Sequence, residues 1–519
     1  MVRTTTYLAA VALAIPLLVI QRLLVVRRRL RALTNLPTDI VLFDPKLPLP
    51  LPNIKWISRE RGWGFRERFT RFSAYGSDII CQVSIFPLLD VTYRLADAKA
   101  ITEVFGRRAA FKAPPEQLGV MKSFGDPNLV ASDDEVHKRQ RKAIAPAFTE
   151  RNMQMVWDEA FRVAQGVFQT EEWCDKQRVS IDHALDMMAE VMMHVIASCG
   201  FGRKLSFDRT RSIPAGHKMS LEDAVRQIAH HSMLKILVPR WLSPINKKWS
   251  DAHTGYEEVR KYTMEIIAQR IDGRTDGADL LSLLLAGADK EDDDTMRLTP
   301  DEVTNNVIIL LLGGHETSSA VFAFLLGELA IDPDLQERLR QSLLPLLPAD
   351  GSPPPYENLA KYSFAVAVIT ETLRMYPIPN NYAKKCVVDT VVQTDTPGLT
   401  LVVPAGTMME INHIGLHYNP KYYPEPYEFK PERFMGKYNT DAFVGFGSGT
   451  RSCPGRKFAE VEMVALLCMF LSRYTIELPD TPEFRNLHSK AELRAKLLAH
   501  TVSLGLVPER VPLTFVRRN

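Results

Sequence analysis

A long apolar run lies in the C-terminal half of the chain, between Thr299 and about Ala330. Helix-start signals precede it, because the Thr299 hydroxyl can cap a first turn, Pro300 suits the first helical position and Glu302 stands where a capping box needs an acid. An Asp-Pro pair at 332–333 marks the end of the run. The pattern predicts one long, apolar helix.

A second apolar run begins at Tyr7, is interrupted at 21–22 and ends at Val26. Its length is roughly what a helix needs to cross the hydrocarbon of a bilayer. Arginines crowd behind it at 27–31, and by the positive-inside rule the chain that follows stays in the cytosol. We therefore expect residues 1–35 to be a membrane anchor with a basic flank, and 36–519 to form one large domain. A cleaved signal peptide is the alternative, although arginines stand where its small-residue cleavage site would lie.

Shorter patterns describe the body of the protein. Residues 78–93 are rich in Ile and Val and are broken by Pro87, which predicts two short strands of a small sheet. Helical patterns dominate afterwards, and apolar helical periodicity begins again at Phe458. Prolines between 37 and 52 predict a stiff spacer in front of the body. The predicted fold class is mainly α with small β-sheets (α+β).

Composition narrows the classes of partner and compartment. The 519 residues carry a net charge of only +3, which gives no reason to expect nucleic acid as a partner. The 6 cysteines are scattered without a disulfide framework. That pattern is typical of a reducing compartment rather than of a small disulfide-stapled secreted protein.

A Gly-rich loop with one cysteine is the most informative segment, and it reads F-G-S-G-T-R-S-C-P-G from Phe446 to Gly455. Gly447 permits a positive φ, so the backbone can turn tightly and approach a flat ligand. Backbone N–H groups around Cys453 and the start of the next helix can both act on its sulfur. The Arg451 guanidinium can fork onto a carboxylate. This spacing suits a thiolate offered to a single metal centre.

Other interpretations of the loop fail on spacing. A dinucleotide fingerprint from Gly445 would need glycine where Thr450 stands, and a P-loop pattern is also absent. Structural zinc sites need a second cysteine close by, and the next one is Cys468. A buried structural cysteine beside a turn remains open from the loop alone.

Two glycines, an acid and a hydroxyl interrupt the long apolar helix at 313–317, in the order Gly-Gly-His-Glu-Thr. Each glycine costs a helix about 1 kcal/mol relative to alanine, so something must compensate. A zinc protease motif would require histidine where Ser319 stands. A notch for a neighbouring helix is an equally good explanation of the glycines from this segment alone.

Two further segments carry charges at suggestive spacing. Glu371 and Arg374 stand three apart, as many solvated helix pairs do, and Pro-Glu-Arg-Phe follows at 431–434. A basic stretch, His-Lys-Arg-Gln-Arg, occupies 137–141. Within it Lys138 and Arg139 are read as a solvent-exposed basic face, which could meet an acidic partner.

In their order along the chain, the segments 137–141, 313–318, 371–374 with 431–434, and 446–455 together resemble motifs of the cytochrome P450 family. The loop matches the family pattern F-x-x-G-x-R-x-C-x-G, and 313–318 match its oxygen-activation motif A/G-G-x-D/E-T-T/S. The E-x-x-R and P-E-R-F segments stand in the family's order. One position departs from the pattern, since His137 stands where the family usually has the tryptophan of W-x-x-x-R. Its ring can still donate to a carboxylate.

The resemblance implies a cytochrome P450 fold with an N-terminal transmembrane helix, and a haem b (iron protoporphyrin IX) bound through the Cys453 thiolate. It implies cofactor contacts from Phe446, Gly447, Arg451, Gly455, His137 and Arg141. Thr317 and Glu316 are then the catalytic pair, acting in oxygen activation and proton relay. Glu371, Arg374 and Arg433 are implied to form a buried structural triad that holds the cysteine loop.

The implied activity is that of a monooxygenase, which inserts one atom of O2 into a lipophilic small molecule. We expect electrons to come from NADPH through a membrane-bound NADPH-cytochrome reductase, with cytochrome b5 as a second candidate donor. A terpenoid, steroid or fatty-acid-like substrate in secondary metabolism, and a single-pass anchor in the endoplasmic reticulum membrane, complete the expectation. The alternatives are a haem-thiolate isomerase or dehydratase, and a non-catalytic membrane-anchored haem- or sterol-binding protein.

Overall fold

The computed structural model describes residues 20–21, 24, 36–44, 52, 54, 56–58, 63–86, 90–205, 207, 213–271, 279–289, 297–379, 381–502 and 505–518. The predicted membrane anchor lies almost entirely outside the described residues. The described residues belong to two compact units. Unit 1 comprises Met1–Pro114, Pro379–Glu428 and Asn439–Ser452, and unit 2 comprises Pro115–Ile378, Phe429–Tyr438 and Cys453–Asn519.

Unit 1 is built on a six-stranded sheet with the order β1-β2-β3-β9-β6-β4. Its strands are β1 (Thr38–Phe43), β2 (Ile79–Phe86), β3 (Asp90–Leu95), β4 (Phe111–Lys112), β6 (Asn381–Cys386) and β9 (Met408–Asn412). A separate hairpin joins β7 (Thr390–Gln393) to β8 (Thr400–Val403), and the helices are α2 (Trp63–Glu67), α3 (Thr70–Tyr75), α4 (Ala98–Gly106) and α15 (His413–His417). The two strands predicted within 78–93 are confirmed as β2 and β3, which pair antiparallel.

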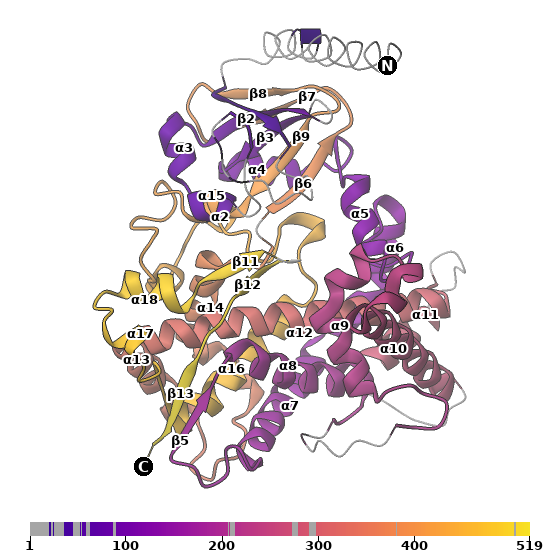
Figure 1. Ribbon diagram of the computed structural model, residues 1–519, viewed down its shortest axis with the longest axis vertical. Coiled ribbons are helices and arrows are strands. Elements are labelled where there is room, and N and C mark those ends of the chain that lie inside the picture. The colour runs from indigo at the N-terminus through magenta and orange to yellow at the C-terminus, as the bar shows by residue number, and fades with distance from the viewer. Residues whose placement is uncertain are drawn as a thin grey trace, which may run out of the picture. The chain divides into compact units, whose positions relative to one another are not determined.

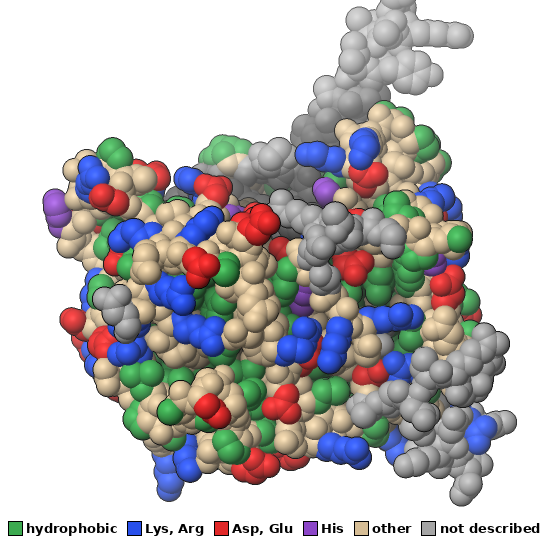
Figure 2. Space-filling model, turned by 90° about the horizontal axis from the view of Figure 1, so that it is seen from below, with side chains coloured by type: hydrophobic (Ala, Val, Ile, Leu, Met, Phe, Trp, Pro, Cys, Tyr) green, Lys and Arg blue, Asp and Glu red, His purple; other side chains and the backbone are tan. Residues whose placement is uncertain are grey.

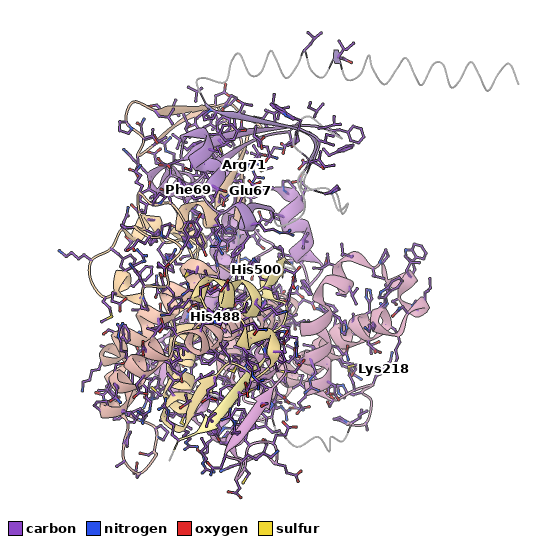
Figure 3. All side chains as sticks on the ribbon, turned by 60° about the vertical axis from the view of Figure 1, so that its left-hand side comes forward. Glu67, Phe69, Arg71, Lys218, His488 and His500 are labelled. Carbon is purple, nitrogen blue, oxygen red and sulfur yellow. The ribbon has the colours of Figure 1, made fainter. Side chains whose placement is uncertain are left out.

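Ion pairs fasten the short helices of unit 1 to its sheet. Arg71 of α3 donates to Glu67 at the end of α2 from Nε at 2.6 Å and from Nη2 at 3.0 Å, and also pairs with Asp39 of β1 (Figure 3). Within the sheet, Arg94 donates to Glu410 at 2.6 Å, where both side chains are buried. Because each buried charge is paired with an opposite one, the free-energy cost of removing it from water is offset.

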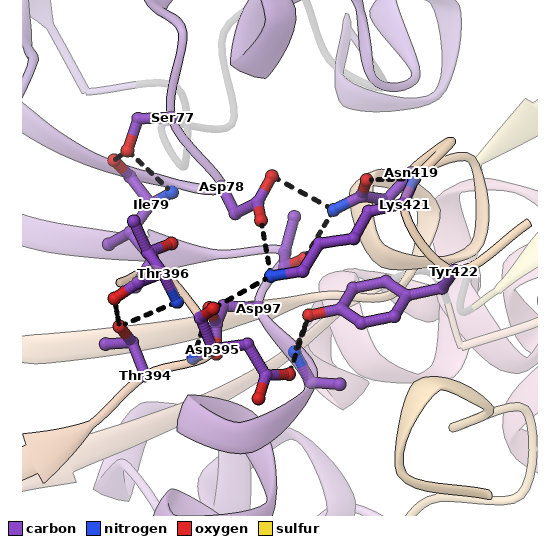
Figure 4. A network of polar contacts seen from close by, with 12 residues as sticks. Ser77, Asp78, Ile79, Asp97, Thr394, Asp395, Thr396, Asn419, Lys421 and Tyr422 are labelled. Carbon is purple, nitrogen blue, oxygen red and sulfur yellow. Dashed lines mark hydrogen bonds and ion pairs between the residues drawn. The ribbon is translucent and has the colours of Figure 1, made fainter. Parts of the chain in front are cut away.

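A polar network fixes the start of α4 (Figure 4). Asp97 caps this helix by accepting from the N–H of Ala100 at 2.9 Å, and it also accepts from the N–H of Asp395. Tyr422 donates to the Asp395 carboxylate at 2.9 Å. Lys421 pairs with Asp78 at 3.4 Å and so closes the network. The position of α4 matters because its last turn packs on the cysteine loop, as described below.

Unit 2 is mainly helical (Figure 1). Its longer helices are α5 (Pro115–Lys122), α6 (Asp134–Ile144), α7 (Glu150–Gln169), α8 (Ala184–Phe201), α9 (Leu221–Leu237), α10 (Lys247–Ile271), α11 (Leu280–Asp289), α12 (Pro300–Ile331), α13 (Pro333–Leu343), α14 (Ser363–Met375), α16 (Arg456–Arg473) and α18 (Lys490–Leu497). Short strands β5 (Arg178–Ile181), β10 (Tyr474–Glu477) and β13 (Leu513–Arg517) form one sheet, and β11 (His500–Val502) pairs with β12 (Leu506–Pro508). The predicted class, mainly α with small sheets, is confirmed.

The long helix α12 starts as the sequence predicts. The Thr299 hydroxyl accepts from the N–H of Glu302, and the Glu302 carboxylate accepts from the N–H of Thr299 at 2.8 Å. The capping box is therefore complete. Among the described residues, α12 is the one helix long and apolar enough to cross a membrane, and most of it is buried in the protein. It is therefore a core helix of unit 2.

Charges of both signs are mixed on the face of the molecule that Figure 2 shows. On the face in Figure 2, acidic and basic side chains alternate with apolar ones, and neither sign forms a continuous field. This mixture agrees with the net charge of +3.

Candidate functional site

The first half of the cysteine loop belongs to unit 1 and is shaped by two glycines. Gly447 and Gly449 have φ of +71° and +63°, in the left-handed region that favours glycine. A Cβ on Gly449 would lie 3.3 Å from the Phe105 carbonyl oxygen, in the last turn of α4. Phe446 and Arg451 are half-buried. Helix α4 and the left-handed turns therefore fix the backbone that leads to the cysteine.

Cys453 begins the part of the loop that belongs to unit 2. Its side chain is accessible, yet burial raises the pKa of its thiol. The Gly455 N–H, which bonds to the sulfur, and the guanidinium groups of Arg141 and Arg456 all act to lower this pKa.

These influences bear on the expected thiolate. The Gly455 N–H and the two arginines lower the pKa of the Cys453 thiol, as the sequence predicts for nearby donors, whereas burial raises it. A metal ion deprotonates a coordinating thiol outright. The donor set therefore fits a metal that replaces the proton, with Gly455 and the two arginines stabilising the resulting charge.

Gly455 also keeps the space beside the sulfur open. A Cβ there would lie 3.9 Å from Cys453 Sγ and 3.8 Å from the Phe148 ring. Phe148 ends the 3₁₀ turn Ala145–Phe148, and no sequence motif marks it. Its place beside the loop follows only from tertiary packing.

Two of the three predicted partners for a haem carboxylate, His137 and Arg141, lie one turn apart on α6. His137 is buried, and Arg141 is half-buried with a pKa that burial lowers and Cys453 raises. Arg141 is thus within electrostatic range of the sulfur. The expectation of a solvent-exposed basic face holds for Lys138 but is wrong for Arg139, which pairs with the buried Glu302 of α12. The sequence signal that was missed is Glu302, the acid of the capping box. Its carboxylate accepts from the Thr299 N–H and also pairs with Arg139.

One face of α12 is open where the rest of the helix is closed. From Glu302 to Ile331 the residues that are not buried are Leu310, Gly313, Gly314, Glu316 and Thr317. Their spacing places them along one side of the helix. We call these residues the open face of α12. It includes both residues of the predicted catalytic pair.

The two glycines of the open face have different surroundings. A Cβ on Gly313 would meet nothing within 4 Å, whereas one on Gly314 would lie 3.1 Å from Ile196 Cδ1 of α8. The notch for a neighbouring helix therefore describes Gly314, and the role of Gly313 in oxygen activation stays a prediction. Gly314 is a notch for the neighbouring helix, and Gly313 keeps free the space in front of α12.

The open face carries two polar side chains, Thr317 and Glu316, that can form hydrogen bonds or transfer protons. Thr317 donates to the Gly313 carbonyl at 2.6 Å, a bond back along its own helix. Glu316 is largely desolvated, and burial raises its pKa to about 7. Beneath them His315 is buried, and its Nδ1 lies 2.8 Å from the Leu311 carbonyl oxygen. A carboxyl that titrates near neutrality can both take and give a proton.

The predicted triad comes together within unit 2. Arg374 and Glu371 are fully buried and share a bidentate contact on α14. Arg433 lies 3.5 Å from the same carboxylate, in the 3₁₀ turn Pro431–Phe434. The N–H of Lys430 also donates to it at 2.8 Å. One carboxylate thus fixes both α14 and the segment before the cysteine loop.

Comparison with known proteins identifies relatives of the whole chain. The model of the family described as "Cytochrome P450" matches residues 54–501. "Cytochrome P450 monooxygenase 124" of Postia placenta is 36% identical over 490 residues, covering 90% of this chain and 94% of its own. "Cytochrome P450 monooxygenase prx9" of Penicillium rubens is 26% identical over 521 residues, covering 89% and 86%. Among solved structures, the cytochrome P450DA heme domain superposes with a TM-score of 0.73 at 22% identity, covering 94% of this chain and 98% of its own, a likeness of fold.

Proposed function

The chain belongs to the cytochrome P450 family as a monooxygenase, and from this premise we propose that it inserts one atom of O2 into a lipophilic small molecule. The other oxygen atom leaves as water, with two protons and with two electrons that NADPH supplies through a reductase. The observation that carries the proposal is the accessible Cys453 thiol, bonded by the Gly455 N–H and near two arginines.

Family membership implies a haem cofactor with cysteine thiolate ligation, and we assign it as haem b bound through Cys453. When bound, the haem iron supplies the activation of O2. Arg451, His137 and Arg141 would hold its carboxylates, since all three can donate to a carboxylate. Phe446 and Gly447 would border it, because a turn without a Cβ leaves room for a flat ring.

The residues of α12 supply the proton chemistry. The Thr317 hydroxyl can exchange its bond to the Gly313 carbonyl for a bond to a reactant in front of the helix. Glu316 can deliver a proton at neutral pH, because its pKa is about 7. Gly313 leaves the space in front of them free. The pair therefore orients a reactant and moves protons, while Glu371, Arg374 and Arg433 hold the cysteine loop in place.

We infer an apolar substrate from the chain segments that face it in this family: 113–124, 307–312, 378–382 and 503–506. Apolar side chains predominate in these segments. A terpenoid, steroid or fatty-acid-like molecule has the matching chemistry. We propose oxidative tailoring in secondary metabolism as the role of the reaction.

We further propose that the protein is anchored in the endoplasmic reticulum membrane by residues 1–35, with its catalytic domain, 36–519, in the cytosol. An NADPH-cytochrome reductase, and cytochrome b5 as a second donor, would dock near Arg456 and Lys457 at the start of α16. Arg456 there is braced by Glu460 at 2.8 Å. Attraction to an acidic partner would then weaken with salt.

Reconstitution under ¹⁸O2 tests this proposal. The detergent-solubilised chain, a microsomal NADPH-cytochrome reductase and NADPH are incubated with farnesol, testosterone and lauric acid as separate probes. We expect one ¹⁸O atom in a product of at least one probe, and no product without the reductase. A rearranged product that needs neither O2 nor NADPH would favour the isomerase or dehydratase. Ligand-induced spectral shifts with no product from any probe would favour the binding protein.

A further inference from the structure

A buried carboxylate near the C-terminal end of α12 links segments that are far apart in sequence. Glu328 is fully buried, and it accepts from the Tyr376 hydroxyl at 2.7 Å. It also accepts from Arg494 Nε, which lies 2.9 Å from each of its oxygens. Tyr376 follows the end of α14, and Arg494 belongs to α18. The same carboxylate therefore holds the ends of two different helices.

Aromatic and close packing contacts reinforce this link one turn away on α12. The ring of Phe324 stacks on that of Tyr376, with centroids 4.4 Å apart and planes 5° from parallel. Phe324 also meets the edge of His500, which begins β11 and is labelled in Figure 3. Gly327 admits Leu498, because a Cβ there would lie 2.4 Å from Leu498 Cδ2. We call Phe324, Gly327 and Glu328 the α12 hub.

The two segments held by the hub also touch each other. Ile378 lies two residues after Tyr376, and its carbonyl accepts from the Leu506 N–H at 2.8 Å. A Cβ on Gly505 would lie only 2.7 Å from both Ile378 Cγ2 and the Ile378 oxygen. No side chain fits at that point, so Ile378 and Gly505 pack directly on each other, and a shift of one must move the other as well.

We propose that Glu328 is a positioning residue for the oxidation, setting through Tyr376 and Arg494 where Ile378 and the start of β12 at Gly505 and Leu506 stand relative to the open face of α12. This inference rests on the proposed function, which puts both segments against the substrate. All parts of the link belong to unit 2, and the hub shares a rigid helix with Glu316 and Thr317. The hub therefore shapes the far part of the substrate space rather than the place where O2 reacts.

Two ligands of different length separate these regions. Imidazole fills only the space at the haem iron, whereas 1-dodecylimidazole also extends into the substrate space. The variants are Tyr376→Phe, which keeps the stacked ring and removes one hydroxyl, and Arg494→Lys, which keeps the charge and removes the shared Nε. Tyr362→Phe is the matched control, because Tyr362 is a fully buried tyrosine at the other end of α14.

We expect the dissociation constant of 1-dodecylimidazole to rise about fivefold or more in both variants, the effect of losing one hydrogen bond to a charged group. The constant for imidazole and the reduced carbon monoxide spectrum should stay as in the wild type. The decisive quantity is the dissociation constant of 1-dodecylimidazole divided by that of imidazole. If this ratio is the same in the variants as in the Tyr362→Phe control, the proposal is overturned, because the hub then has only a structural role. If Arg494→Lys does not fold, the pair Glu328→Gln with Arg494→Met removes both charges together and takes its place.

A readout that needs no cofactor keeps the inference separate from the proposed function. Hydrogen exchange at the Leu506 amide reports whether the start of β12 stays bonded to Ile378. It should become faster in Tyr376→Phe and stay unchanged in the control. Unchanged exchange would contradict the proposed coupling even in a protein with a normal haem. Absence of a thiolate-type spectrum from the wild type would instead contradict the proposed function.

Discussion

The Arg374 guanidinium donates to the Glu371 carboxylate from Nε at 2.7 Å and from Nη2 at 2.8 Å, and both side chains are completely buried. The two charges lie one helical turn apart on α14, and the carboxylate reaches out of that helix to Lys430 and Arg433. The pair therefore ties α14 to the segment that precedes the cysteine loop. Removal of either member leaves a charge without its partner in the core.

Arg374→Ala should cost about 3–5 kcal/mol of unfolding free energy, because it strands the Glu371 carboxylate in the core. We expect little protein to carry haem, measured as the ratio of haem to protein after purification. Arg338→Ala is the control, since Arg338 forms an exposed pair with Glu432 and should cost less than about 1 kcal/mol. Wild-type haem content in Arg374→Ala would show that the buried pair does not hold the loop.

Gly313→Ala and Gly314→Ala should have different effects on the free energy of unfolding. The first fills open space and should stabilise the protein by about 1 kcal/mol through helix propensity alone. The second forces its methyl group against Ile196 and should lose that gain. Urea denaturation of both variants measures the difference, and Ile196→Val added to Gly314→Ala should restore stability by removing the methyl it meets.

The same substitutions should affect ligand binding in the opposite order, because the variant that stabilises the protein should be the one that binds the ligand less well. Gly313→Ala narrows the space in front of the open face, so it should weaken the spectral response to 1-dodecylimidazole although the protein is more stable. Gly314→Ala with Ile196→Val should leave that response unchanged. Equal responses from both would mean that Gly313 does not border the reactants.

The Glu316 carboxyl should make stability depend on pH. Burial raises its pKa from the ordinary 4.5 to about 7, so the folded state holds the proton between these values while the unfolded state releases it. The free energy of unfolding should therefore fall as pH rises from about 4.5 to about 7 and stay constant above, a loss on the order of 3 kcal/mol from this group. Glu316→Gln should abolish that slope in urea denaturation series.

Glu135→Gln is the control for this titration, since Glu135 is exposed on α6 and should leave the slope unchanged. A wild-type slope retained in Glu316→Gln would place the titrating group elsewhere. In turnover, the same variant should remove the limb of the pH–rate profile near neutrality.

The sequence predicted those helices and strands whose formation depends on residues close to one another in the chain. The capping box at Thr299 and Glu302, the strands within 78–93 and the helix around Phe458 could be predicted because caps, periodicity and turn residues are local. The association of Glu371 with Arg374 and Arg433 followed from the family resemblance. Spacing alone fits a solvated pair equally well.

Tertiary packing decided what the sequence could not. Nothing local says that Ile196 presses on Gly314, that Arg139 turns inward to Glu302, or that Glu328 collects Tyr376 and Arg494. The effect of burial on Cys453 is not local either, because the loop sequence shows the donors that lower the pKa of its thiol but not the packing that raises it. Nothing in the structure explains why the fully buried Glu462 is an acid.

The most direct test of the account is the carbon monoxide difference spectrum of the dithionite-reduced, detergent-solubilised protein, recorded beside Cys453→His. We expect the wild type to show the long-wavelength Soret band that thiolate ligation gives, and Cys453→His to show the shorter-wavelength band of imidazole ligation. The shorter-wavelength band in freshly prepared, folded wild type, or no haem at all, would contradict the assignment of Cys453 as the ligand on which the proposed function depends.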